Sequence, residues 1–268
     1  HTSCLCRLYE AGSLTQGEVV AFINYMTQIL IALVVVANLV VTFTKAAASA
    51  ARINEIFDTK PSITDDGNSE VKPVAGAAKI SFRDVNFRYY EGAALALKNI
   101  SMEIPAGSLI GVIGGTGSGK STLVSMIPRL YDVSSGSVLL DGTDVRNYPL
   151  TQLHEKVGMV PQGNQLFSGT IRENLQWRKP NASDTELWKA LTDAQAESFV
   201  RSLPEGLDSK VEQGGKNFSG GQQPRLTIAR ALVGESEILI LDDCSSALDY
   251  ATDAALRKSL RRRAEHAT

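Results

Sequence analysis

The sequence has 268 residues, of which 43% are hydrophobic and 21% are charged. This balance excludes a disordered or fibrous chain and allows one or two folded domains. The chain has 27 basic and 29 acidic residues and a formal net charge of −2, and this lack of a basic excess argues against a nucleic-acid-binding protein.

The three cysteines, Cys4, Cys6 and Cys244, form no zinc-binding pattern. We expect them to be free thiols in a reducing compartment. The sequence starts at His1 without a signal-peptide pattern, and we interpret it as a piece of a longer protein.

An apolar segment near the N-terminus predicts a membrane-spanning helix. Residues 19–44 contain no Asp, Glu, Lys or Arg, and neither Pro nor Gly occurs between Glu18 and Lys60. At about 1.5 Å per residue, a helix of this length crosses a hydrocarbon core of roughly 30 Å. We expect the helix over residues 18–58, in the C-terminal part of a transmembrane domain at 1–58. A buried helix of a soluble protein is the alternative.

Polar and charged residues in and after this span predict its neighbouring helices and its orientation in the membrane. Asn24, Gln28 and Asn38 lie inside the span, and such groups usually face other helices. We therefore expect a helix bundle whose other members come from elsewhere. Lys45 and Arg52 follow the apolar run, so that end is expected in the cytoplasm.

The remaining chain has the pattern of an α/β domain. Residues 59–78 are polar, with Pro and Gly, and predict a linker. A domain at 79–268 follows, in which short apolar runs alternate with helical stretches. The expected strands lie at 79–89, 108–114, 157–162 and 237–243, and the expected helices at 120–130, 184–202, 222–233 and 250–263. This alternation predicts a mostly parallel sheet.

A glycine-rich stretch, GVIGGTGSGKSTL at 111–123, predicts a phosphate-binding loop. Its glycines let backbone N–H groups converge on phosphate oxygens, and a helix that starts near Lys120 adds its N-terminal partial charge. Lys120 supplies a positive charge for the β and γ phosphates of ATP, and the Ser121 hydroxyl is a ligand for Mg²⁺.

A second apolar run, ILILDD at 238–243, ends in two acids. In nucleotide-binding proteins with a phosphate loop, a buried strand ends in an Asp that holds the magnesium ion. We assign this role to Asp242, at the strand end where open α/β sheets place their ligands.

Three further motifs carry a resemblance to a family. NFSGGQQPRLTIARALV at 217–233 is followed by LDDCSSALD at 241–249, and LFSGTIRENL lies at 166–175. The chain closely resembles the ATPase domain of ABC transporters, with the third motif typical of exporters. The resemblance implies a P-loop NTPase fold with a helical signature subdomain, preceded by a transmembrane helix, in a cell-membrane protein whose ATP-binding domain is cytoplasmic.

The resemblance also implies roles for single residues. Tyr89 stacks on adenine, and Gln162 reaches the metal and couples to the membrane domain. The signature caps its helix through Ser219 and points at ATP held by a second subunit. The expected metal ligands are Ser121, Gln162 and Asp242, and the expected catalytic residues are Lys120 and Asp243. The expected contacts of Mg-ATP are Tyr89, Gly114, Gly115, Thr116, Gly117, Ser118, Gly119, Lys120, Ser121, Thr122, Gln162, Asp242, Ser219, Gly220, Gly221 and Gln222.

The chain departs from the family at the second acid. Active members carry Glu where this chain has Asp243, whose carboxylate is one methylene shorter. A misplacement of about 1 Å costs on the order of a hundredfold in rate. We therefore expect tight Mg-ATP binding, slow hydrolysis and a role as the degenerate-site subunit of a heterodimeric multidrug exporter. The alternative is a homodimer in which Asp243 acts through a bridging water.

Three smaller departures accompany this one. Phe218 replaces the usual Leu, and Pro224 falls in the first turns of the signature helix, where it removes a donor and favours a kink. The family's switch histidine lies farther beyond the second acid than His266, so we expect this piece to lack that residue and a central strand.

The resemblance leaves three function classes open. The first is an ATP-driven export subunit that pairs with a second exporter half, contacts membrane lipid and moves a small molecule, lipid or peptide. The second is a soluble ABC ATPase, which the uncharged residues 19–44 argue against. The third is a switch that binds ATP with little hydrolysis, which Asp243 leaves possible.

Overall fold

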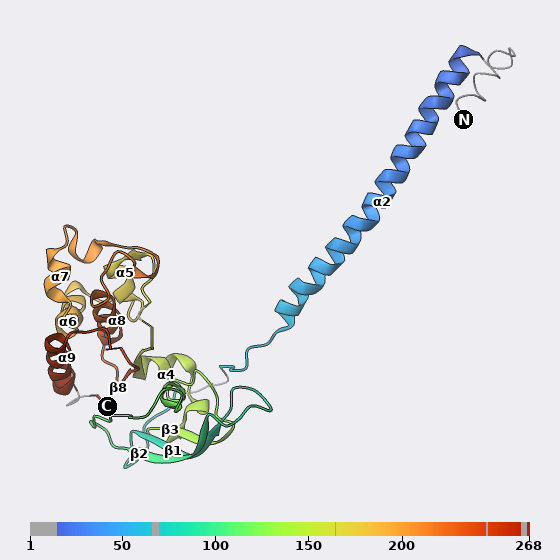
Figure 1. The fold of residues 1–268 in the computed structure, drawn as a ribbon. Coiled ribbons are helices and arrows are strands. Elements are labelled where there is room, and N and C mark those ends of the chain that lie inside the picture. The colour runs from blue at the N-terminus through green and yellow to red at the C-terminus, as the bar shows by residue number, and fades with distance from the viewer. Residues whose placement is uncertain (1–14, 66–69, 164, 245, 264–266) are drawn as a thin grey trace. The chain divides into compact units, whose positions relative to one another are not determined.

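The computed structural model describes residues 15–65, 70–163, 165–244, 246–263 and 267–268. The chain forms two compact units, His1–Ser62 and Ile63–Thr268. Figure 1 shows the elements of each unit. Cys4, Cys6 and His266 lie outside the described residues.

The first unit is built on a single long helix, α2 (Gln16–Asp58). A capping box starts it, because Thr15 accepts a hydrogen bond from the Glu18 N–H and the Glu18 carboxylate accepts one from the Thr15 N–H. No residue of α2 is buried, and by length and apolar composition it is a candidate membrane span. The predicted N-terminal helix is confirmed.

An antiparallel sheet opens the second unit. Its strands β1 (Ile80–Phe87), β2 (Leu97–Ile104), β3 (Ser135–Leu140) and β4 (Thr143–Asp144) pair in the order β2-β1-β3-β4. One face of this sheet is apolar and covers a core that also contains Leu123 and Leu153 from the helices α3 (Lys120–Ser125) and α4 (Leu150–Lys156).

A parallel strand pair lies beside this core. β5 (Val157–Val160) and β8 (Ile238–Leu241) pair in parallel from Val157–Ile238 to Val160–Leu241. Ile238 and Ile240 join the apolar core under β1–β3. The two strands therefore bring the loop after β5 and the acids after β8 to the same edge.

The remaining elements form a mostly helical region with its own apolar core. Its helices, which Figure 1 shows grouped together, are α5 (Ile171–Gln176), α6 (Asp184–Asp193), α7 (Glu197–Ser202), α8 (Gln222–Leu232) and α9 (Tyr250–Arg263). The 3-10 helices Val145–Asn147, Gly206–Asp208 and Gln213–Gly215 and the antiparallel pair β6 (Gly169–Thr170) and β7 (Lys210–Val211) complete the unit.

The α/β class is confirmed, whereas the expectation of a mostly parallel sheet needs correction. Within the described residues only β5 and β8 pair in parallel, and the other strand pairs are antiparallel. Residues 108–114 form no strand in the structure, because they have no hydrogen-bonded neighbour strand among the described residues. Their side chains are accordingly open to solvent, with Ile113 at 98% exposure.

Candidate functional site

The phosphate loop has a backbone that only glycine adopts easily. Gly117 and Gly119 have φ values of 78° and 88°, in the left-handed region that L side chains avoid. A Cβ on Gly119 would lie 2.9 Å from the Ala96 carbonyl oxygen. Gly119 therefore lets the loop pass close to the start of β2 before α3 begins at Lys120.

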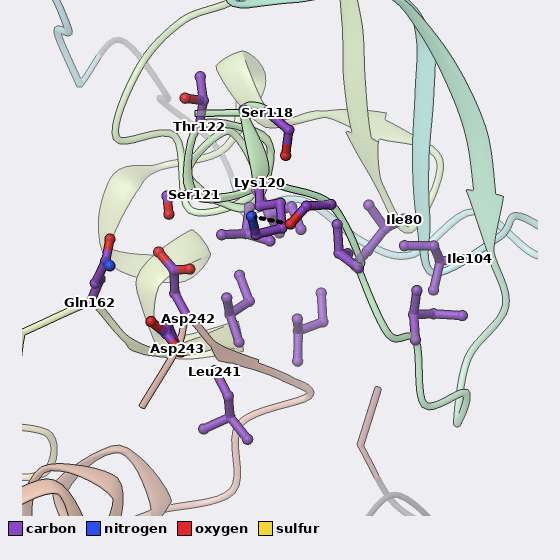
Figure 2. Close-up of a pocket in the computed structure, with 18 of the residues that line it drawn as sticks. Ile80, Ile104, Ser118, Lys120, Ser121, Thr122, Gln162, Leu241, Asp242 and Asp243 are labelled. Carbon is purple, nitrogen blue, oxygen red and sulfur yellow. Dashed lines mark hydrogen bonds between the residues drawn. The ribbon is translucent and has the colours of Figure 1, made fainter. Parts of the chain in front are cut away.

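Lys120 is held by its own loop. Its Nζ donates to the carbonyl oxygens of Gly114 at 2.9 Å and Gly115 at 2.8 Å. These contacts hold the ammonium group against the loop. The dashed line at Lys120 in Figure 2 marks a hydrogen bond of this group.

The two acids that follow β8, Asp242 and Asp243, line the cavity that the phosphate loop also lines. The Asp242 N–H donates to the Val160 carbonyl oxygen at 3.0 Å, which extends the β5–β8 ladder by one residue. Asp243 has φ 49°, and this left-handed turn ends the ladder. The turn separates the directions of the two neighbouring carboxylates.

The predicted metal ligands come together. Ser121 starts from α3, Gln162 from the loop after β5, and Asp242 from the end of β8. Figure 2 shows their side chains gathered on one side of the opening. A hydroxyl, an amide and a carboxylate all supply oxygen, the donor that Mg²⁺ prefers, so this set fits a magnesium ion.

A single cavity of about 770 Å³ joins these groups. Of the residues predicted to contact Mg-ATP or to act in catalysis, it is lined by Tyr89, Gly114, Thr116, Gly117, Ser118, Gly119, Lys120, Ser121, Thr122, Gln162, Asp242 and Asp243. Gly115 and the signature residues Ser219, Gly220, Gly221 and Gln222 do not line it.

The loop that carries Gln162 is tied to the signature helix α8. Arg230, on α8, donates through Nη2 to the Gln165 carbonyl oxygen at 3.1 Å. Its guanidinium lies 5.1 Å from the centre of the Phe167 ring, and that ring stacks on Trp177 with 4.5 Å between centroids. Burial lowers the pKa of Arg230, yet an arginine stays charged near neutral pH.

The signature turn corrects one prediction. Gly221, not Ser219, is the N-cap of α8, and no side chain caps the helix. Instead the Ser219 N–H donates to the Gln222 side-chain oxygen at 2.9 Å. The predicted helix start at residue 222 is confirmed, whereas the predicted N-cap lies two residues too early, because a Ser before a helical run usually caps it.

Pro224 causes no kink in this structure. Because α8 begins at Gln222, Pro224 lies in the first turn, where the backbone N–H has no partner within the helix. Its side chain is buried. Phe218, the other departure in this motif, is 7% exposed and packs edge-on against Phe199.

Cys244 follows the two acids and is buried. Burial, with the nearby charges of Asp243, Asp253 and Asp242, raises the pKa of its thiol to about 11. A thiol in this state is a poor nucleophile at neutral pH. The expectation of a free thiol holds for Cys244.

Comparison with known proteins decides the family. The family model described as ABC transporter matches residues 97–246, more than half of the chain. This chain belongs to the ABC transporter family. The match includes the phosphate loop, the loop of Gln162, the signature turn and both acids after β8.

Relatives share both units of the chain. The uncharacterized ABC transporter ATP-binding protein YfiB of Bacillus subtilis is 42% identical over 93% of this chain and 43% of its own length. The ATP-dependent lipid A-core flippase of Desulfotalea psychrophila is 37% identical over 93% of this chain and 43% of its own. The chain thus spans less than half the length of these relatives.

A solved structure agrees with the fold. The structure of a bacterial Atm1-family ABC exporter with ATP bound is 32% identical in sequence and matches with a TM-score of 0.77 over 95% of this chain and 45% of the other. The exporter-type ABC ATPase fold predicted from the motifs is therefore confirmed.

Proposed function

We propose that this chain is the ATP-binding part of an ABC exporter subunit, which couples the binding and hydrolysis of Mg-ATP to transport across a membrane. The observation that carries the proposal is the single cavity lined by Lys120, Ser121, Gln162 and Asp242. In this site Lys120 neutralises phosphate charge, and the three oxygen donors hold the magnesium ion that polarises the phosphates.

Calorimetry with Mg-ATP tests the binding step. We expect the parent chain to bind and Lys120→Met to bind roughly ten- to hundredfold more weakly, because a hydrogen bond to a charged group contributes about 1.5–3 kcal/mol. Lys216→Met, which removes an exposed lysine outside the cavity, is the matched control. Equal affinity of Lys120→Met and the control would exclude the phosphate loop as the binding site.

The second step of the proposal concerns hydrolysis. Asp243 lines the cavity but its carboxylate is one methylene shorter than that of Glu, so its reach toward an attacking water is reduced. We propose that this site hydrolyses ATP slowly and that the subunit pairs with a second exporter half whose own site is active. In that pair Ser219, Gly220, Gly221 and Gln222, which lie outside this chain's cavity, complete the partner's site.

ATPase measurements on the chain alone and with a partner half test this step. Asp243→Glu should raise the rate of the chain's own site by up to about a hundredfold, while Asp243→Asn should lower it further. Rapid hydrolysis by the parent, unchanged in Asp243→Glu, would favour a homodimer in which Asp243 acts through a water. Tight binding with no hydrolysis in any combination would favour a nucleotide-dependent switch.

The membrane step of the proposal rests on α2. The helix has no buried residue in the structure, and it is long and apolar enough to cross a membrane. We propose that α2 crosses a cell membrane as one of several helices, with Lys45 on the cytoplasmic side together with the ATP-binding unit. Extraction of the membrane fraction at alkaline pH should leave the chain in the pellet, whereas release into the supernatant would favour a soluble ATPase.

The relatives suggest the kind of cargo. One of them is named as a lipid A-core flippase, and we propose an amphipathic lipid or small molecule as the transported compound. A reconstituted full-length protein should show ATPase stimulation by such a compound and not by soluble peptides. Stimulation by peptides alone would overturn this choice.

A further inference from the structure

Tyr89 stands at the mouth of the cavity, two residues beyond the end of β1. Its side chain is 54% exposed, a level at which a tyrosine ring usually changes rotamer freely. Here its hydroxyl lies 2.7 Å from the Thr122 hydroxyl, which belongs to the first turn of α3 and is buried. A direct hydrogen bond therefore joins the ring to the phosphate-loop helix.

Two other rings hold the body of the Tyr89 side chain. The buried Phe87 meets it edge-on, with 4.9 Å between centroids and 78° between planes. Tyr131, from the loop between α3 and β3, meets it at 5.4 Å and 89°. Tyr131 also contacts Phe87 at 5.5 Å, so the three rings form one cluster.

Tyr131 supports Tyr89 from outside the binding site. The cavity that contains the phosphate loop is lined by Tyr89 and Thr122 but not by Tyr131. Tyr131 is 44% exposed and packs on the Tyr89 ring without reaching the phosphate loop. We therefore expect its contribution to ligand binding to pass through Tyr89.

We infer that Tyr131 and the hydroxyl bond to Thr122 position the Tyr89 ring for the base of a nucleotide. This inference rests on the proposed function. A hydroxyl has one donor and two acceptor sites, so Thr122 can accept a hydrogen bond from Tyr89 and still donate its own O–H to a phosphate oxygen. The Thr122 side chain thereby links the Tyr89 ring, which contacts the base, to the phosphate loop, and it fixes the distance between them.

The linkage predicts a difference between two probes. Mg-ATP has a base and a triphosphate, whereas inorganic tripolyphosphate with Mg²⁺ has the phosphates alone. A side chain that is already fixed before binding loses less conformational entropy when the ligand binds, so the binding free energy becomes more favourable by about that amount. The edge-on contact between the two rings contributes a similar free energy. Loss of the Tyr131 support should therefore affect Mg-ATP and spare the phosphate-only probe.

The experiment is a calorimetric titration of the full chain and its variants with both probes. Tyr131→Leu should weaken Mg-ATP binding roughly two- to tenfold, with tripolyphosphate affinity unchanged. Tyr131→Phe keeps the ring and should restore the parent affinity. Tyr250→Leu, which changes a 91% exposed tyrosine outside the cavity, is the control and should match the parent.

A second variant tests the hydrogen bond between the two hydroxyl groups, and it keeps the inference testable if Tyr131→Leu does not fold. Tyr89→Phe keeps the stacking ring and removes only the bond to Thr122, and it should also weaken Mg-ATP selectively. Parent-like Mg-ATP affinity in Tyr131→Leu and Tyr89→Phe would refute the inference and leave the proposed function intact. Equal weakening of both probes by Tyr131→Leu would refute it too, because it would show a general structural effect. A parent chain that binds neither probe would overturn the proposed function itself.

Discussion

Four buried or partly buried charged residues connect four segments of the ATP-binding unit. Lys79 Nζ lies 2.8 Å from Asp141 Oδ1 and also contacts Glu237, while Lys156 Nζ lies 2.6 Å from Glu237 Oε1 and 3.4 Å from Asp141 Oδ2. Each lysine is thus shared by both acids. The ring of charges connects the start of β1, the end of β3, the end of α4 and the start of β8.

Asp141→Asn is the change that isolates this network. Asp141 is 9% exposed at its side chain, and Lys79 and Lys156 are 11% and 12% exposed. Removal of one partner from a buried ion pair costs about 3–5 kcal/mol. Glu237, although 44% exposed, still pairs with both lysines in this variant. We therefore expect a loss of free energy of unfolding at the lower end of this range, about 3 kcal/mol.

The structure argues that this cost is electrostatic. Asp141 has φ 51°, a left-handed conformation that Asn adopts as easily as Asp. The backbone bonds of Asp141, from its N–H to the Lys79 carbonyl and from the Val74 N–H to its own carbonyl, do not depend on the side chain. Asn therefore changes the charge and little else.

Urea unfolding of the full chain in detergent measures the effect, with the fluorescence of Trp177 and Trp188 as the probe. Lys179→Gln is the control, because the Lys179–Glu186 pair is 48% and 38% exposed and such a pair contributes about 0–1 kcal/mol. If Asp141→Asn loses no more free energy of unfolding than Lys179→Gln, the network does not stabilise the fold as we reason.

The remaining predictions address other parts of the unit. Glu237→Gln should destabilise the fold at pH 7. Burial raises the pKa of Glu237, but the hydrogen bonds and charges of Lys156 and Lys79 outweigh this effect and hold the pKa below its usual value. The stabilisation by Glu237 is therefore full above its unfolded pKa and disappears as pH falls through its lower folded pKa, below which the variant and the parent should match. Gly119→Ala should lower the melting temperature and Mg-ATP affinity together, since the left-handed backbone costs about 1–2 kcal/mol and the Cβ meets the Ala96 carbonyl. Pro224→Ala should leave α8 content, measured by hydrogen exchange, unchanged. Alkylation of Cys244, followed by peptide mass spectrometry, should be slow at pH 7.5 and rise only as pH approaches its pKa of about 11.

Short motifs allowed much of the site to be predicted from the sequence. The phosphate loop, Gln162 and Asp242 were each recognisable because a few adjacent residues determine both the chemistry and the local backbone. The structure then brings them to one cavity. That convergence follows from the parallel pairing of β5 with β8. The apolar runs predicted parallel strands in general but not which two strands pair.

Other features depend on pairings between distant residues. β1 pairs with β3 through contacts such as Phe82 with Val138. The residue pattern of neither segment predicts which strand it pairs with, or that the pairing is antiparallel. For the same reason Tyr131 was not found, since its role comes only from its packing against Tyr89. The predicted N-cap of α8 is wrong because Ser219 uses its backbone N–H, rather than its hydroxyl, within the turn.

Asp243 combines a short side chain with an unusual backbone. Its φ of 49° lies in the left-handed region, which Asp tolerates better than a longer L residue does, and the Ser246 hydroxyl donates to its carbonyl at 3.2 Å. Glu at this position would gain reach toward the γ-phosphate and lose backbone stability. A faster ATPase in Asp243→Glu should therefore come with a lower melting temperature. A faster enzyme of unchanged stability would mean that the turn is not under this constraint, and that side-chain length alone separates slow from fast hydrolysis.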